Sequence, residues 1–470
     1  MRRKVKACVI GAGSAGLFSL GQLRKHTTDF AIINSGHLGT TCARVGCMPS
    51  KVLIQAAEDF HNREHFAASG IDGAGALSVD IPRVLKHVRA MRDTFVGGVM
   101  GNFNKGPARK LVEGPAKFIA PGVIEVNGEE IEAEGFILAP GSRPVMPASW
   151  AAFGERVLTT DNLFEQEDLP GKMAVLGLGA IGLEMGQALA RLGIEITGVD
   201  MLETIGGLED EAVRDEAIKL ISKDLDLWLG DPAELEEAPD GRILVRAGSR
   251  EVVVDKVLVA LGRRSNLDTL DLAAAGVSLD ERGMPEIDPA TMQIPGTRMF
   301  VVGDANGERA LLHEAGDEGR IAGYNIFADE VRAFRRKTPF AIAFSSPNIA
   351  RVGKTMKNLQ GRDDYAVGTR NFDTQARARV LHENAGLLHI YGRKSDGLIL
   401  GAEMIAPRGE HLANELAWAI EKNLTVWDLL AMPFYHPVVE EGMQNALYNL
   451  AAKVGGQPDG VIEVAFSEFK

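Results

Sequence analysis

Short apolar runs recur along the chain, and two of them lead into a glycine-rich turn followed by a helical pattern. The first unit occupies residues 5–23, with the glycines of its turn between Gly11 and Gly16. The second occupies residues 173–190, with its glycines between Gly177 and Gly182. Unbroken apolar runs of this length are typical of buried parallel strands. The pattern therefore predicts two strand–turn–helix units of the same kind.

Each unit continues into a second apolar run, at residues 30–34 and 195–200, that ends in a polar side chain. Asn34 lies 23 positions after Gly11 (34 minus 11), and Asp200 lies 23 positions after Gly177 (200 minus 177). A ribose-binding side chain occupies this place in dinucleotide-binding units. Asp200 would repel a 2′-phosphate, and no Lys or Arg follows it until Arg214, so we expect NAD rather than NADP at the second unit.

The spacing of the glycines gives these turns a chemical meaning. Such glycines allow a tight turn, a close approach of the backbone to a pyrophosphate and close packing of the helix on the strand. A single turn of this kind is weak support, because glycine-rich turns also serve as connectors. Two turns with matched spacing predict two dinucleotide sites, with these glycines as ligands: Gly11, Gly13, Gly16, Gly177, Gly179 and Gly182.

Three further apolar runs end in turn-forming residues, at residues 137–144, 257–263 and 299–304. Gly141 and Gly262 lie in the first two of these turns, and we expect both near a bound cofactor. Asp304 ends the third run, where a carboxylate can face a polyol chain. The alternative for Asp304 is an ordinary turn.

Cys42 and Cys47 are separated by four residues and lie just before Pro49, which can open a helix. A loop of this size can close as a disulfide and reopen. A helix starting here would direct its positive end at Cys47 and favour the reactive thiolate. A zinc half-site or two inert thiols are the alternatives. Zinc usually needs four ligands, the chain has no second cysteine pair, and the nearby His37, His61 and His65 are more typical of a solvated surface.

A histidine near the C-terminus is followed by carboxylates. If a helix begins after Pro437, Glu440 or Glu441 can hydrogen-bond one imidazole nitrogen of His436, fix its tautomer and raise its basicity. A dithiol must lose a proton before it attacks a disulfide. Beside a redox-active pair, this motif predicts a base rather than an ordinary helix start.

Length and charge limit the remaining choices. A chain of 470 residues is too long for one core and suggests three or four units. A net charge of −13 without a basic run argues against nucleic acid and anionic membranes. Three cysteines suit a reducing compartment, where Cys8 is a small buried hydrophobic residue. We find no signal core or membrane-length stretch and expect a cytoplasmic protein without a membrane partner.

Together these motifs resemble the FAD-dependent pyridine nucleotide-disulfide oxidoreductases, most closely the dihydrolipoyl dehydrogenases. The resemblance implies an α/β fold with two Rossmann-like dinucleotide-binding domains, for FAD and NAD, and a C-terminal α+β dimerisation domain. We expect the FAD-binding domain at residues 1–145 and 268–335, the NAD-binding domain at 146–267 and the interface domain at 336–470.

The resemblance also implies roles for the site residues. Cys42 and Cys47 would form the redox disulfide, Cys42 exchanging with substrate and Cys47 lying under the flavin. Lys51 and Glu184 match an ion pair beside the flavin. His436 and Glu441 match an acid–base pair that is lent across the interface of a homodimer, and His436-Pro437 matches a cis peptide. The expected FAD ligands are Gly11, Gly13, Gly16, Asn34, Lys51, Gly141 and Asp304; the expected NAD ligands are Gly177, Gly179, Gly182, Asp200 and Gly262.

The chain departs from the family pattern at several positions. Asn34 stands where Glu is common, Thr40 where Gly is common, Arg44 where Asn is common and Pro140 where Thr is common. Arg44 is the most consequential, because its charge can either stabilise the Cys47 thiolate or point outward to an acidic carrier protein. These departures put the physiological partner in question.

The resemblance implies oxidation of a protein-bound dihydrolipoyl group with NAD. NADH-dependent reduction of another disulfide is one alternative, and a catalytically silent flavoprotein subunit is another. Glutathione reductase would carry basic residues after Asp200, and mercuric reductase would carry C-terminal cysteines; this chain has neither. Intact Cys42, Cys47, His436 and Glu441 argue against a silent subunit.

Overall fold

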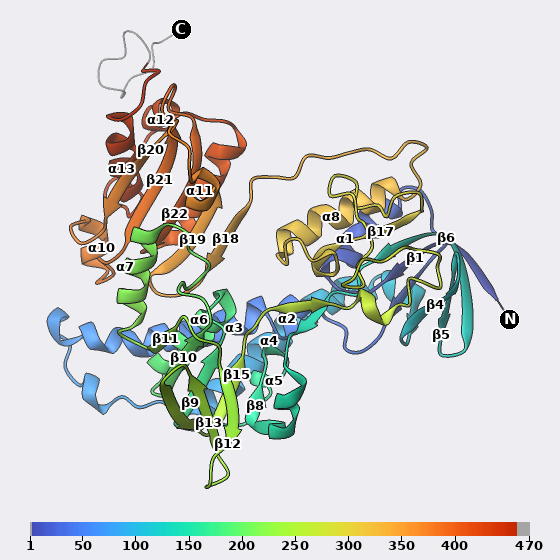
Figure 1. The fold of residues 1–470 in the computed structure, drawn as a ribbon, viewed down its shortest axis with the longest axis horizontal. Helices are drawn as coiled ribbons and strands as arrows, with labels where there is room; N and C mark the ends of the chain where they lie inside the picture. The colour runs from blue at the N-terminus through green and yellow to red at the C-terminus, as the bar shows by residue number, and fades with distance from the viewer. Residues whose placement is uncertain (1, 458–470) are drawn as a thin grey trace.

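The computed structural model describes residues 2–457 and consists of three sheets with their covering helices, together with smaller β elements (Figure 1). The first large sheet has seven strands in the order β3-β2-β1-β6-β5-β4, with β17 also paired to β6. Its core is parallel, because β1 pairs in parallel with β2 and β6. The strands are β1 (Arg3–Ile10), β2 (Phe30–Asn34), β3 (Leu111–Glu113), β4 (Ala116–Ala120), β5 (Val123–Val126), β6 (Glu129–Leu138) and β17 (Met299–Val301).

The second large sheet has five parallel strands in the order β11-β10-β9-β15-β8. An antiparallel three-stranded sheet, β12-β13-β14, and the short pair β7 with β16 accompany it. These strands are β7 (Ser142–Pro144), β8 (Val157–Leu158), β9 (Lys172–Leu176), β10 (Glu195–Asp200), β11 (Asp226–Leu229), β12 (Glu234–Glu237), β13 (Ile243–Ala247), β14 (Arg250–Val254), β15 (Lys256–Val259) and β16 (Arg263–Ser265).

The third large sheet is antiparallel, in the order β18-β19-β22-β21-β20, and lies in the C-terminal part of the chain. An extended connection joins it to the first unit (Figure 1). Its strands are β18 (Phe340–Ala343), β19 (Asn348–Gly353), β20 (Tyr365–Asn371), β21 (Leu387–Arg393) and β22 (Ile399–Ala406).

Helices connect the strands and cover the sheets, as expected for parallel units that need both faces buried. In chain order they are α1 (Ser14–Leu23), α2 (Thr41–Arg44), α3 (Cys47–His61), α4 (Ile81–Asn104), α5 (Thr160–Leu163), α6 (Ala180–Arg191), α7 (Glu211–Ile221), α8 (Leu312–Asn325), α9 (Met356–Leu359), α10 (Ala376–Val380), α11 (Gly409–Glu421), α12 (Val426–Leu430) and α13 (Glu441–Ala451).

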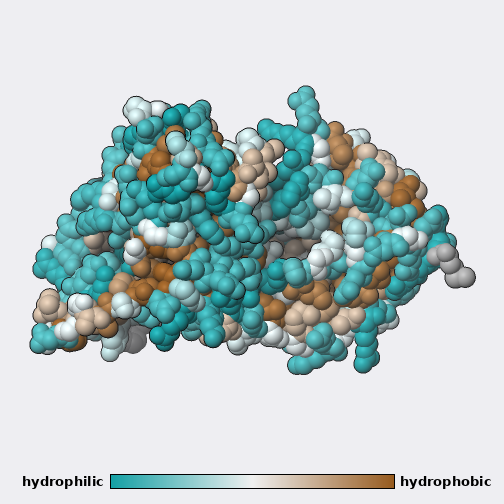
Figure 2. Space-filling view, turned by 90° about the horizontal axis from the view of Figure 1, so that it is seen from below, coloured by the Kyte–Doolittle hydropathy of each residue, from teal (hydrophilic) through white to brown (hydrophobic). Residues whose placement is uncertain are grey.

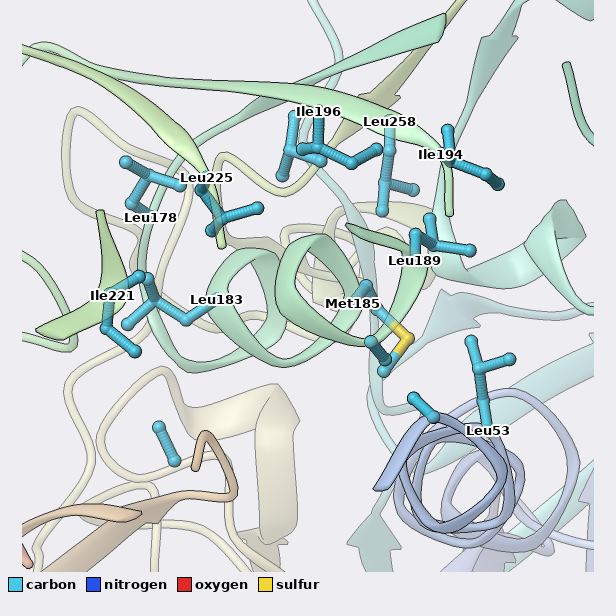
Figure 3. Packing of buried hydrophobic residues seen from close by; sticks show 14 of the residues in the cluster. Leu53, Leu178, Leu183, Met185, Leu189, Ile194, Ile196, Ile221, Leu225 and Leu258 are labelled. Carbon is cyan, nitrogen blue, oxygen red and sulfur yellow. The ribbon is translucent and has the colours of Figure 1, made fainter. Parts of the chain in front are cut away.

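Helix α3 packs against the second unit although it belongs to the N-terminal part of the chain. Leu53 of α3 and Met185 of α6 are buried in one hydrophobic cluster and lie close together (Figure 3). Ala57 of α3 and Leu85 and Val88 of α4 belong to the same cluster. Helix α3 therefore links the two parallel sheets.

A buried polar network joins the second unit to the C-terminal sheet. Asp210, at the start of α7, accepts hydrogen bonds from His389 Nδ1 at 2.7 Å and from Tyr391 Oη at 2.9 Å. Glu403 accepts from the backbone N–H groups of Glu209 and Asp210 at 2.6 and 3.1 Å. Burial raises the pKa of Asp210, but the bonds from His389 and Tyr391 outweigh it and hold that pKa below its usual range.

The predicted α/β fold class is confirmed: one sheet with a parallel core and one parallel sheet are followed by a C-terminal unit of helices and an antiparallel sheet. The domain boundaries stay predictions, and the last part of the expected interface domain, residues 458–470, lies outside the described residues. From below, the surface is mostly hydrophilic, with scattered apolar patches and a recess between its two halves (Figure 2). Within residues 2–457, no helix is both long and apolar enough to cross a membrane.

Candidate redox and nucleotide sites

The two cysteines lie on consecutive helical segments. Cys42 belongs to the short helix α2, and Cys47 is the first residue of α3, after the cap residue Gly46. The helix start expected here is therefore present. Both residues are free thiols.

The surroundings make the two thiols unequal. The hydrogen bond from the Cys42 thiol and the charge of Lys51 lower the pKa of Cys47 to about 7, against the effect of burial. The same hydrogen bond and burial raise the pKa of Cys42. Cys47 is thus the thiol of the pair that ionises first, and Cys42 donates the hydrogen bond that stabilises its thiolate.

Lys51 and Glu184 meet across the contact between α3 and α6. Lys51 Nζ lies 2.6 Å from Glu184 Oε2, and Glu184 is 6 % exposed. The backbone N–H of Phe344 donates to Glu184 Oε1 at 3.0 Å, and the Phe344 ring centroid lies 4.3 Å from Lys51 Nζ. The contact with Phe344 was not predicted, because nothing in the sequence connects residues 160 positions apart.

The first glycine turn is shaped to receive an anion. Gly11 has a φ of +107°, and a Cβ there would lie 2.0 Å from the carbonyl oxygen of Ala139, so no other residue fits. A Cβ built at Gly13, in contrast, would have no neighbouring atom within 4 Å. Asn34 Oδ1 accepts a hydrogen bond from the backbone N–H of Ala12 at 3.1 Å. The turn, the start of α1 and Asn34 therefore border one open cradle that fits a dinucleotide.

The second turn repeats this geometry. Gly177 has a φ of +93°, and a Cβ there would clash with the carbonyl oxygen of Ala260. A Cβ at Gly179 would have no neighbouring atom within 4 Å. Asp200 accepts from the backbone N–H of Leu178 at 2.6 Å and from that of Leu202 at 2.9 Å. The residues fit a second dinucleotide, and the Asp200 carboxylate lies at the end of β10.

Asp304 lies in a polar group next to the first turn. Ser142 Oγ donates to Asp304 Oδ2 at 2.8 Å, and Arg263 Nε donates to Ser142 Oγ at 2.8 Å. Gly141 precedes Ser142 with a φ of +70°, and Gly262 precedes Arg263 with a φ of +100°. Gly141 and Gly262 therefore place Ser142 and Arg263 beside Asp304. Ser142 and Arg263 were not singled out from the sequence, although polar residues directly after strand-ending glycines are a usable signal.

Arg44 lines a cavity of about 640 Å³. Lys51 is the cation that acts on Cys47, so the structure does not support Arg44 as the group that stabilises this thiolate. The cavity runs between α2, α4, α5 and the β7–β16 pair; it is bordered by His37, Thr41, Arg44, Val45, Arg92, Asp93, Val96, Ser142, Asp161, Glu165 and Arg263.

His436 and Glu441 form a separate group. His436 Nδ1 lies 2.9 Å from Glu441 Oε1, and this hydrogen bond holds the pKa of Glu441 below its usual range. The His436 side chain is 75 % exposed, and His436-Pro437 is a cis peptide. Helix α13, which begins at Glu441, lies far from α2 in the single chain (Figure 1). The structure therefore does not bring His436 to Cys42 of the same chain.

The histidines near the cysteine pair pack against another unit instead of standing free. The ring of His65 stacks on that of His382 at 4.7 Å, and the ring of His61 lies 6.2 Å from that of His65. Burial and the two neighbouring histidines lower the pKa of His65. Among the residues that the structure describes, no group of three or more His, Cys, Asp or Glu side chains is placed to hold a metal ion.

Comparison with known proteins gives this geometry a family. Residues 5–319 match the family "Pyridine nucleotide-disulphide oxidoreductase", and residues 339–447 match its dimerisation domain. The chain belongs to the pyridine nucleotide-disulphide oxidoreductases. It is 34% identical over 453 residues to a dihydrolipoyl dehydrogenase of Thermus scotoductus, covering 93% of this chain and 95% of the relative. It is 30% identical over 449 residues to a dihydrolipoyl dehydrogenase of Geobacillus stearothermophilus, covering 93% of this chain and 94% of that relative.

Solved structures show the same fold at lower identity. The flavoprotein disulfide reductase RclA from Escherichia coli superposes with a TM-score of 0.84 at 22% identity, over 95% of this chain and 99% of RclA. LpdA from Mycobacterium tuberculosis superposes with a TM-score of 0.82 at 23% identity, over 95% of this chain and 100% of LpdA.

Membership of the family confirms several predictions. The protein is a flavoprotein oxidoreductase of the disulphide oxidoreductase family, and its cofactors are FAD and NAD. The match to the dimerisation domain supports a homodimer. The roles of the individual residues stay predictions.

Proposed function

We propose that the protein is a dihydrolipoyl dehydrogenase that oxidises a lipoyl dithiol carried by a protein, with Cys42 and Cys47 as its exchanging disulfide. The inequality of the two thiols is the observation that carries the proposal. The pKa of Cys47 is lowered to about 7 and that of Cys42 is raised. Cys47 is therefore the better leaving group of the disulfide, and Cys42 is the sulfur that a substrate thiolate attacks. The curated relatives share this activity by name.

In the proposed reaction the Cys42–Cys47 disulfide is reduced and the substrate dithiol is oxidised. One substrate thiolate attacks Sγ of Cys42, the Cys42–Cys47 bond breaks, and Cys47 leaves as the thiolate because its pKa is the lower one. The second substrate sulfur then attacks the first and closes the lipoyl disulfide. Cys42 is released and ends as the thiol. Of the two substrate protons, one is held by His436 and the other by Cys42.

His436 is the proposed base. When Glu441 accepts a hydrogen bond from Nδ1–H, Nε2 is left free to take the substrate proton, and the carboxylate stabilises the imidazolium that forms. Because His436 is exposed and distant from α2 of its own chain, we propose that it serves the cysteine pair of the partner subunit.

The nucleotide sites have proposed residues as well. When bound, FAD and NAD would supply the two-electron and hydride-transfer chemistry that the reduced cysteine pair needs in order to be reoxidised. Gly11, Gly13, Gly16, Asn34 and Asp304 would hold FAD, together with Lys51 and Gly141. Gly177, Gly179, Gly182, Asp200 and Gly262 would hold NAD. We place the protein in the cytoplasm, because a redox-active pair among three cysteines suits a reducing compartment.

Steady-state rates test the proposal. We expect purified protein to turn over dihydrolipoamide with NAD and to be slower with NADP, and the Cys42→Ser and Cys47→Ser variants to lose this activity. A lipoyl-carrying domain should have a lower KM than free dihydrolipoamide. Bound FAD with negligible dihydrolipoamide turnover, but with NADH-dependent reduction of another disulfide, would refute the substrate assignment and leave the redox pair in place.

A further inference from the structure

Three arginines line the cavity beside α2, and they differ in their partners. Arg92 Nε lies 2.9 Å from Asp93 Oδ1, and its guanidinium also pairs with Glu165. Arg263 donates to Oγ and to the carbonyl oxygen of Ser142, at 2.8 and 2.7 Å. Arg44, which is half-buried, makes no side-chain hydrogen bond or ion pair with any residue between 2 and 457. Arg44 thus borders the cavity and has no counterion among these residues.

The aliphatic part of the Arg44 side chain lies against the segment that precedes α2. A Cβ built at Gly39 would lie 3.4 Å from both Cγ and Cδ of Arg44. The cation that lowers the pKa of Cys47 is Lys51, on the following helix. Arg44 is therefore free to pair with a different anion.

The cavity borders the first nucleotide turn. Ser142, which lines the cavity, hydrogen-bonds Asp304 at 2.8 Å. Ala139, three residues before Ser142, closes against Gly11 of the turn. The segment with Arg44 follows β2, whose last residue, Asn34, binds the backbone N–H of Ala12 in that turn. Both walls of the cavity thus continue into the cradle that fits the diphosphate of a dinucleotide.

We propose that Arg44 binds the diphosphate of FAD, as a ligand that this chain has in addition to the glycine turn. The inference rests on the FAD site assigned above. A guanidinium offers a planar set of donors that matches phosphate oxygens and keeps its charge at all physiological pH values. The acidic residues of the cavity do not neutralise Arg44. Asp93 and Glu165 are paired with Arg92, and Asp161 is exposed, where solvent and salt screen its charge.

Release of FAD from the holoenzyme at increasing NaCl concentration tests this role without measuring activity. We expect Arg44→Asn to speed FAD dissociation by about tenfold at low salt, the size expected for one lost charge-assisted contact. We also expect Arg44→Lys to fall between this variant and the unsubstituted protein. Because the lost contact is ionic, the rate for Arg44→Asn should depend less on salt. Arg83→Asn, at an exposed position of α4, is the matched control and should behave as the unsubstituted protein.

The outcomes separate this inference from the proposed function. Equal FAD dissociation from Arg44→Asn and the unsubstituted protein at every salt concentration would overturn the role of Arg44 alone. Faster release with an unchanged salt dependence would also overturn it, since that result indicates a loosened fold rather than a lost charge. Purified unsubstituted protein without FAD would instead refute the cofactor site itself.

Discussion

At the scale of single residues, the hydrogen bond between the two thiols and the charge of Lys51 decide which sulfur is ionised. We expect Cys42→Ala to raise the pKa of Cys47 from about 7 toward the ordinary value of about 8.5, because the bond that stabilises the thiolate is lost. Lys51→Met should also raise it. Below the pKa Cys47 is protonated and alkylates slowly; above it the thiolate reacts.

The rate of iodoacetamide labelling of the Cys47 peptide in reduced protein, followed by mass spectrometry from pH 5 to 10, reports this pKa. Arg83→Asn serves again as the control with an unchanged midpoint. If Cys42→Ala left the midpoint at about pH 7, the contact between the thiols would not be its cause.

Single residues also show what could be predicted from the sequence. Asn34 and Asp200 lie at the ends of their strands because the local spacing of strand, turn and helix fixes those positions. The contacts of Phe344 with Lys51 and Glu184, and the network of Asp210, Tyr391 and Glu403, depend on how distant units meet. No local sequence pattern predicts contacts between distant segments, so only the structure could show them.

At the scale of elements, a strained residue precedes the short helix α2. Thr40 precedes it with φ 65° and ψ 148°, a conformation that favours glycine, and its hydroxyl accepts a hydrogen bond from the backbone N–H of Ala43 at 3.3 Å. The backbone strain costs about 1–3 kcal/mol. The cap is worth about 1 kcal/mol.

Two substitutions at this position separate the cap from the strain. Thr40→Ala removes the cap and keeps the strain, so it should lower the thermal midpoint of the holoenzyme. Thr40→Gly also removes the cap but relieves the strain, and its midpoint should lie above that of Thr40→Ala by the equivalent of about 1 kcal/mol or more. Thermal unfolding at fixed protein and FAD concentration checks the order. Equal midpoints for both variants would contradict the strain at Thr40.

The bounds of helices and strands were the features that the sequence predicted best. Strands β2 and β10 have the bounds expected from the apolar runs, and a helix starts at Cys47 ahead of Pro49. The attachment of α3 to the second unit through Leu53 was not foreseen, because its apolar positions show that one face is buried but not what covers it.

At the scale of the whole molecule, the separation of His436 from α2 predicts shared active sites in the dimer. A dimer of one Cys42→Ser subunit and one His436→Gln subunit has one site with both native groups, if each site combines the cysteines of one chain with the histidine of the other. Random mixing yields half heterodimers, so about a quarter of the native activity should return.

Refolding the two inactive variants together and assaying dihydrolipoamide oxidation tests this arrangement, with each variant refolded alone as the control. Size-exclusion chromatography should show that the mixture is dimeric. Full dimer formation without any recovered activity would contradict sites shared between subunits.

Helix α3 carries Cys47 at its first residue, Lys51 one turn later, and Leu53 against the core of the second unit, where we propose that NAD binds. Lys51 thus lowers the pKa of the thiol and also pairs with Glu184 of that unit. Thermodynamic linkage makes such a dependence reciprocal. A nicotinamide nucleotide whose binding alters the Lys51–Glu184 contact changes the acidity of Cys47, and deprotonation of Cys47 changes the affinity for that nucleotide by the same factor.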